Sequence, residues 1–366
     1  MASKLAVATV LAGILWMAPL GHAARADGEL PALRAELLTA PAVMPERIAA
    51  AQGQGTNAVV VEISGATDAD KARLRRAATL IVESGLRLYY WIEVGRNEEL
   101  ARAHPEWMAS LQGHAEWRRF HPDFPQPAGG QVVKNFPWVP IHYRESFAVH
   151  LDRVRALLAD LPAAEGIFLN DLQGGPSACG CGNTLCRWTA DYGSIRTATD
   201  YGDRAAADFV EAVEQMTPES KIIPVWVTEC EQSDGAHDGP CAGVGCYDGI
   251  CWRAYCRQLT PLARTADQLG VLLTVRAMER DTAQYEQPAG WITHALATFQ
   301  TMPPRRGGTP VAADRLIAVI QGWDVPEAFL AAQKLRVRAA GAAGYVVASF
   351  PVEQSWQPRI IAVHGR

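Results

Sequence analysis

Short apolar runs rich in β-branched residues alternate along the chain with amphipathic segments. The runs are nearly continuous, which is typical of parallel strands buried on both faces. They predict eight strands, at residues 35–39, 57–63, 86–93, 166–171, 221–228, 271–275, 316–321 and 344–349. The amphipathic segments predict a short helix that begins near Pro45. They predict further helices over residues 68–84, 144–161, 200–216, 252–269, 291–299 and 326–340. For the helix at 68–84, Asp68 is the expected cap and Gly85 the expected terminator.

Eight strands that alternate with helices predict an α/β fold, a (β/α)8 TIM barrel with long, cysteine-containing loops on its C-terminal face. An open, doubly wound sheet is the main alternative. No G-x-G-x-x-G motif follows the first strand and no G-x4-G-K-[ST] motif occurs, so the dinucleotide and P-loop signatures of that alternative are missing. We expect one barrel domain over residues 27–366.

The first 26 residues have the layout of a secretory signal peptide. Lys4 supplies a positive charge, residues 5–20 are apolar apart from a few small or breaking residues, and Ala24-Arg25-Ala26 forms a small-x-small cleavage site. An uncleaved N-terminal anchor is the alternative. The pattern predicts a secreted or periplasmic protein with no integral membrane segment after cleavage, since no apolar run reaches 18 residues.

Eight cysteines lie close together in the chain, and none lies elsewhere. An even number in an exported chain predicts disulfide bonds, which here would join the loops after the fourth and fifth strands. The spacing lacks the paired C-x2-C of common zinc sites, the C-x-x-C-H of covalent haem and the ferredoxin run, so no metal and no cofactor are expected. A metal or cluster site and free thiols are the alternatives. The cysteines are Cys179, Cys181, Cys186, Cys230, Cys241, Cys246, Cys251 and Cys256.

The longest connections follow strands rather than helices. Residues 95–143, 172–199 and 229–251 each come after a predicted strand, which in a barrel places them on the C-terminal face, where active sites form. Apolar residues make up 49% of the chain, enough for a substantial core. The net charge of −5 leaves no basic excess for binding nucleic acid.

Carboxylates stand at or just past the ends of several predicted strands, where Asp and Glu are unfavourable as strand residues. Two such groups in a barrel mouth can act as nucleophile and proton donor in the cleavage of a glycosidic bond. If Asp171 points inward, then Leu169 does so too and Asn170 points away, because side chains alternate along a strand. Salt bridges and loop caps are the alternative. The predicted catalytic residues are Asp171, Glu229, Asp324 and Glu93.

Three segments resemble glycoside-hydrolase-type TIM barrels, the nearest positional match being the alpha-amylase clan. The resemblance implies that Asp171 is the nucleophile, Glu229 the general acid/base and Asp324 the transition-state stabiliser. Leu169 and Trp323 stand where that clan has an arginine and a histidine. The segments are residues 166–171, 224–229 and 320–324.

Tryptophans are frequent, 11 in the whole chain, and aromatic faces suit the apolar faces of sugar rings. Packing of each tryptophan against the barrel is the alternative. We expect Trp91, Trp107, Asn170 and Trp323 to bind a carbohydrate substrate or ligand. The sequence therefore predicts an exported glycoside-hydrolase-like protein that cleaves or binds a carbohydrate in the barrel mouth. The alternatives are a non-catalytic barrel that binds saccharide or a cell-envelope partner, and a cysteine-based metal or redox protein on a barrel scaffold.

Overall fold

A computed structural model describes most of the chain between residues 30 and 362. The described residues are 30–109, 111, 121–141, 144–172, 198–227, 246–247, 250–251, 262–274, 289–301, 309–352 and 357–362. None of the helices in these ranges is both long and apolar enough to cross a bilayer.

Eight parallel strands form a closed barrel with the order β1-β11-β10-β9-β6-β5-β3-β2. This confirms the predicted (β/α)8 fold, because the hydrogen-bonded ring joins the last strand to the first. Each of the eight overlaps a predicted strand. The strands are β1 (Leu33–Thr39), β2 (Ala58–Glu62), β3 (Arg87–Glu93), β5 (Gly166–Asn170), β6 (Lys221–Val227), β9 (Leu269–Leu273), β10 (Leu316–Gln321) and β11 (Gly344–Ala348).

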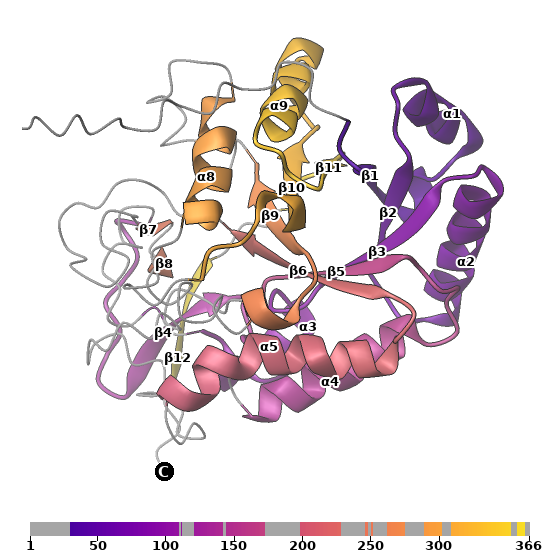
Figure 1. Ribbon diagram of the computed structural model, residues 1–366. Coiled ribbons are helices and arrows are strands. Elements are labelled where there is room, and N and C mark those ends of the chain that lie inside the picture. Colours follow the sequence, from indigo (N-terminus) through magenta and orange to yellow (C-terminus); the bar gives the residue numbers. More distant parts are fainter. Residues whose placement is uncertain are drawn as a thin grey trace, which may run out of the picture.

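Helices cover the outside of the barrel (Figure 1). They bury one apolar face each, such as Leu74, Ala78 and Ile81 of the second helix. The main helices are α1 (Pro45–Gly53), α2 (Asp68–Glu83), α4 (Arg144–Leu158), α5 (Ala198–Met216), α8 (Gly290–Thr301) and α9 (Glu327–Ala339). Shorter elements are η1 (Ala40–Ala42), η7 (Ala313–Arg315), β7 (Cys246–Tyr247) and β8 (Ile250–Cys251).

The start of α2 differs from the prediction by one residue. Thr67, not Asp68, is the N-cap, and its side chain accepts a hydrogen bond from the backbone N–H of Asp70. Asp70 in turn accepts from the backbone N–H of Thr67, which completes a capping box. Gly85 follows the helix with a φ of 74°, as expected of a terminating glycine.

Strand β9, which corresponds to the sixth predicted strand, begins two residues earlier than predicted. Its first residue is Leu269, so the helix expected over 252–269 ends before that residue. Gly270 therefore lies inside this strand. A Cβ on Gly270 would lie 2.8 Å from the side chain of Val225 on β6. Only glycine lets these two neighbouring strands approach so closely.

Large aromatic side chains fill one side of the barrel interior. Along β3, Tyr90 points outward and donates its hydroxyl to the carbonyl of Pro162, so Tyr89 and Trp91 point inward. The Trp91 ring stacks on Phe168 of β5 with centroids 5.8 Å apart. Room for Tyr89 comes from its register partner Gly166, whose added Cβ would lie 3.0 Å from the tyrosine ring.

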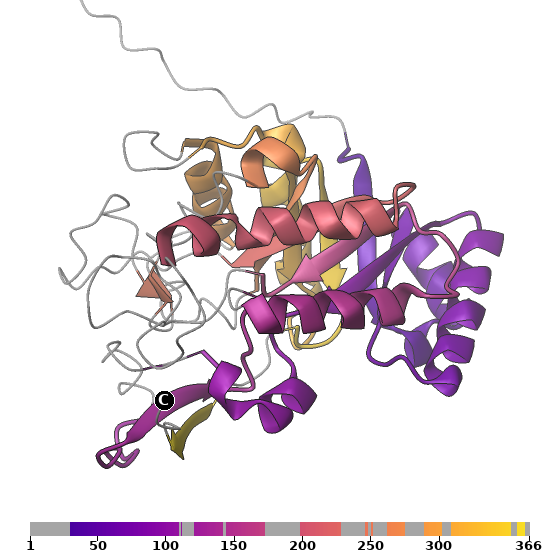
Figure 2. The ribbon, with the colours of Figure 1, turned by 90° about the horizontal axis from the view of Figure 1, so that it is seen from below.

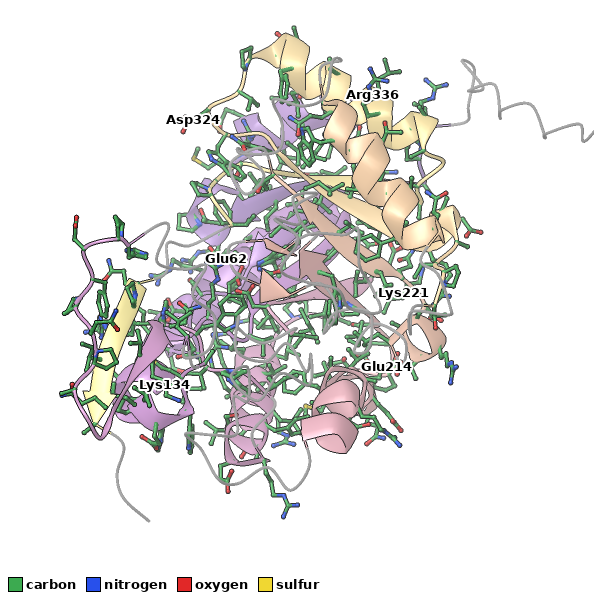
Figure 3. All side chains as sticks on the ribbon, turned by 90° about the vertical axis from the view of Figure 1, so that its left-hand side faces the viewer. Glu62, Lys134, Glu214, Lys221, Asp324 and Arg336 are labelled. Carbon is green, nitrogen blue, oxygen red and sulfur yellow. The ribbon has the colours of Figure 1, made fainter. Side chains whose placement is uncertain are left out.

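The segment after β3, predicted as a loop, contains regular structure. It forms α3 (Glu98–Ala103), η2 (Pro105–Trp107) and β4 (Gln131–Phe136), and β4 pairs antiparallel with β12 (Gln357–Ala362) near the end of the chain. Figure 2 shows this two-stranded sheet projecting from the barrel. Lys134, labelled in Figure 3, is buried and donates to the carbonyls of Glu106 and Met108, which ties β4 to the turn after α3.

Candidate active site

The carboxyl end of β3 meets that of β5 on the inner face of the barrel. Glu93 and Asn170 are register partners on these two strands. Glu93 points inward because it follows Trp91 by two residues, and Asn170 follows Phe168 in the same way. Both side chains are buried, with Glu93 9% and Asn170 1% exposed. The two strands thus bring a carboxyl and an amide together at the mouth.

Hydrogen bonds fix the Glu93 carboxyl from two sides. The indole N–H of Trp91 donates to Glu93 Oε1 over 2.7 Å. The amide of Asn170 donates to Oε1 over 3.1 Å and to Oε2 over 3.0 Å. The backbone is fixed as well, since Arg153 of α4 donates to the carbonyl oxygen of Glu93 over 2.8 Å. Three elements therefore set the position of this one side chain.

Asp171 lies immediately beyond β5 and turns its side chain toward Glu93. Its φ of 61° is in the left-handed region, which aspartate tolerates better than most residues. The turn fits closely against Gly95, where an added Cβ would lie 2.4 Å from the Asp171 carbonyl oxygen. Arg96 Nε lies 3.0 Å from Asp171 Oδ2. The Arg96 guanidinium also lies over the ring of Trp138, 5.3 Å from its centroid.

The two carboxyls of Glu93 and Asp171 shift each other's titration. Burial raises the pKa of Glu93 to about 8, and the negative charge of Asp171 adds to that rise. Burial also raises the pKa of Asp171, while the charge of Arg96 and a hydrogen bond from Glu93 oppose that rise. Arg96 favours the charged form of Asp171, whereas burial and the charge of Asp171 favour the protonated form of Glu93. The pair therefore presents a protonated carboxyl at neutral pH.

Glu62 supplies a further carboxyl on the inner face. It ends β2 and is the register partner of Trp91, so it faces the interior one layer below Glu93. Burial raises its pKa. Among the described residues Glu62 has no ion pair or hydrogen bond from its side chain. Figure 3 shows it among the barrel strands.

The predicted catalytic residues are placed unequally. Glu93 and Asp171 come together, although Asp171 does so from a turn and Asn170, expected to point away, points inward. Asp324 is exposed, and Figure 3 places it at the rim of the molecule. Glu229 lies outside the described residues, so its expected position opposite Asp171 stays a prediction.

Three tryptophans expected to bind carbohydrate have different surroundings. Trp91 is fully buried, so its ring offers no face to a ligand and it acts on Glu93 instead. Trp107 stacks on His104 with centroids 3.7 Å apart and is 8% exposed. Trp323 is 7% exposed and belongs to the main apolar core. These contacts correspond to the packing alternative that the sequence left open.

Arg96 is a residue of the site that sequence reasoning did not identify. The available signal was its place three residues after Glu93, directly behind Gly95. A glycine and an arginine just past a strand that ends in glutamate predict a tight turn carrying a cation, but not which carboxylate that cation meets.

The cysteines contribute little to this picture. Only Cys246 and Cys251 lie in described segments, where they are register partners in the β7–β8 pair. The other six lie outside the described residues, so the predicted disulfides stay predictions.

No family model matches the chain, and no curated protein matches it. Solved structures do resemble it. A chitinase from Chromobacterium violaceum shares 11% identity and a TM-score of 0.38, covering 79% of this chain and 68% of its own. The GH5_18 structure from Streptomyces cattleya in complex with GlcNAc shares 13% identity with a TM-score of 0.43, covering 87% of this chain and 71% of its own. A beta-glycosidase from Pyrococcus horikoshii shares 12% identity with a TM-score of 0.40, covering 87% of this chain and 84% of its own.

The fold class itself rests on the strand order, because similarities at these identities and TM-scores add nothing to it. By that order the chain is a (β/α)8 barrel, with the carboxyl pair Glu93–Asp171 at its mouth.

Proposed function

We propose that the protein hydrolyses a glycosidic bond in the barrel mouth, with Glu93 as the proton donor. The observation that carries the proposal is the buried carboxyl pair, in which burial and the charge of Asp171 raise the pKa of Glu93 to about 8. A glycosidase needs such a group, because an alkoxide leaving group must be protonated as the bond breaks.

In this mechanism Glu93 gives its proton to the glycosidic oxygen and becomes a carboxylate. The Trp91 indole and the Asn170 amide already donate to Glu93, so they stabilise the charge that forms. Asp171 touches Glu93 directly and acts as a positioning residue that sets its pKa. Arg96 keeps Asp171 charged and in place.

A second carboxylate has to act on the sugar from its other face, as nucleophile or as the base that activates water. Asp171 is too close to Glu93 for that role, because the two are hydrogen bonded. We assign it to Glu62 or to Glu229. Glu62 has the support of its inward position and its lack of a partner among the described residues; Glu229 has the support of its predicted place after β6.

The test compares two kinds of substrate. Glu93→Gln should lower kcat/KM on unactivated disaccharides by about 10²–10⁴-fold, the usual contribution of a general acid. On 2,4-dinitrophenyl glycosides the loss should be far smaller, because that leaving group departs without a proton. Glu62→Gln and Glu229→Gln should be compared on both substrates, since loss of the second carboxylate slows both. Wild-type kcat/KM should fall as pH rises through about 8, where Glu93 loses its proton.

Glu83→Gln, which removes an exposed carboxyl from α2, is the matched control and should leave turnover unchanged. Equal loss on both substrates in Glu93→Gln would contradict the role of Glu93 as acid. A wild-type protein that binds saccharides without turning any over would instead favour the non-catalytic binding barrel.

We also propose that the protein acts outside the cytoplasm after removal of residues 1–26, with its cysteines in disulfides. The signal-peptide layout and the even cysteine count support this. N-terminal sequencing of the exported protein should begin at Asp27. Intact mass after alkylation should not change unless the protein is first reduced.

A further inference from the structure

The seam where the barrel closes, between β11 and β1, has an unusual outer surface. In a regular (β/α)8 barrel each strand is followed by a helix that covers the outside. After β11 the described residues, 349–352 and 357–362, contain no helix, and the chain continues to β12, which pairs with β4. Figure 1 shows β1 and β11 between α9 and α1. Within the described part of the chain, the outer face of this seam is therefore bordered by two helices and covered by no third.

A cavity of about 490 Å³ lies over this seam. Its floor includes Val347 of β11, whose register partner on β1 is Glu36. Its walls come from α1 and the residue after it, including Arg47 and Gln54, and from α9, including Lys334. The volume is in the range of small-molecule sites, about 300–1,000 Å³.

The charged groups of the cavity balance one another. Glu36 pairs with Arg47. Lys334 has no ion pair with any described carboxylate, and its ammonium lies 5.7 Å from the ring centroid of Tyr345. Glu327 also lines the cavity. Two carboxylates and two cations give the lining no net charge that would favour an anion or a cation.

The half-buried charges are incompletely solvated where they stand. Burial raises the pKa of Glu36 and lowers the pKa of Lys334. The charged form of each side chain is therefore less well hydrated in the cavity than it would be in bulk water. A ligand that hydrogen bonds to both would restore part of what burial removes.

We propose that this cavity binds an uncharged polyhydroxylated ligand, of monosaccharide to disaccharide size, at a site separate from the barrel mouth. Hydroxyl groups suit the lining because each can donate to Glu36 or Glu327 and accept from Lys334 or Gln54. Val347 offers an apolar surface for the C–H face of a ring. The site stands on its own residues and does not depend on the proposed hydrolysis.

The experiment uses the full chain carrying Glu93→Gln, which slows any hydrolysis of the probes. Hydrogen exchange is followed in peptides covering residues 33–56 and 327–348, with cellobiose, maltose and N,N′-diacetylchitobiose as probes. At least one probe should slow exchange in both peptides. Adding Lys334→Met should raise the concentration needed for half-maximal protection at least tenfold, and adding Gln54→Ala should raise it severalfold. Adding Lys221→Met, which removes an exposed ammonium at the start of β6, should leave it unchanged.

Absence of protection in these two peptides with all three probes would overturn the proposal. Protection that persists unchanged in both the Lys334→Met and Gln54→Ala variants would overturn it as well. The readout is independent of turnover, so failure of this site and failure of the proposed function give different results.

Discussion

Two arginine–carboxylate pairs stand at two seams of the barrel, and they differ in burial. Between β3 and β5, Arg96 pairs with Asp171, and their side chains are 11% and 2% exposed. Next to the β11–β1 seam, Arg47 pairs with Glu36, and their side chains are 45% and 12% exposed. The chemistry of the two pairs is the same, but only the first lies beside another buried carboxyl, that of Glu93.

The difference comes from what covers each seam. The segment between β3 and β5 places Trp138 against Arg96, and α4 places Arg153 on the Glu93 backbone. At the β11–β1 seam no helix of the described residues lies between α9 and α1. The covered seam buries its charges and shifts their pKa values strongly, whereas the seam without a covering helix among the described residues leaves Arg47 half-exposed.

The largest expected effect is on stability when the buried pair is broken. Arg96→Met should lower the free energy of unfolding at pH 7 by about 3–5 kcal/mol, because Asp171 is left as a buried charge without its cation. The loss should be smaller at pH 5, where Asp171 can take up a proton. Urea unfolding at both pH values measures this. A loss below about 1 kcal/mol at pH 7, the range of surface pairs, would show that the Arg96–Asp171 pair behaves like an exposed one.

The second prediction concerns the pH dependence of stability. The folded-state pKa of Glu93 is raised from 4.5 to about 8, so the folded protein binds the extra proton more tightly than the unfolded chain. Stability from this group is fully present below pH 4.5 and is lost as pH rises through about 8. The free energy of unfolding should therefore fall more steeply from pH 5 to pH 9 in the wild type than in Glu93→Gln. Parallel profiles for the two proteins would contradict the raised pKa.

A smaller effect is expected on the pH profile of activity. Asp171→Asn removes the negative charge that helps to keep Glu93 protonated, so the basic limb of kcat/KM should move to lower pH. Initial rates between pH 5 and pH 10 on an unactivated disaccharide measure the shift.

Trp91→Phe should shift the pKa of the same Glu93 carboxyl in the opposite direction. It removes an N–H that stabilises the ionised form of Glu93, so the basic limb should move to higher pH. Shifts of the same sign in both variants would mean that general loosening of the site, and not electrostatics, moves the limb.

The smallest effect is expected at the half-exposed pair. Arg47→Met should lower the free energy of unfolding by about 0–1 kcal/mol, since solvent screens a guanidinium that is 45% exposed. Urea unfolding of Arg47→Met and Arg96→Met under the same conditions compares the two losses in the free energy of unfolding. Equal losses from the two substitutions would remove the distinction between the covered and the uncovered seam.

The site was only partly predictable from the sequence. Glu93 and Asp171 could be found because carboxylates at the ends of apolar strands need an explanation, and both are buried. The orientation of Asn170 was missed, since Asp171 was expected to share the inward face of the strand and instead reaches Glu93 from a left-handed turn. The role of Trp91 was also missed, because a sequence does not show that an indole N–H will donate to a carboxyl two residues away.

The sequence by itself determined the eight strands and most of the helices, because local apolar periodicity acts within neighbouring segments. It favoured a closed parallel barrel but left an open sheet as the alternative, and the pairing of β1 with β11 decided between them. Only the tertiary structure decided that β12 returns to pair with β4, that the last seam has no covering helix in its described residues, and that Asp171 meets both Glu93 and Arg96. These features depend on contacts between residues about 75 to 230 positions apart or on turn geometry, and such contacts leave no periodic signal in the chain.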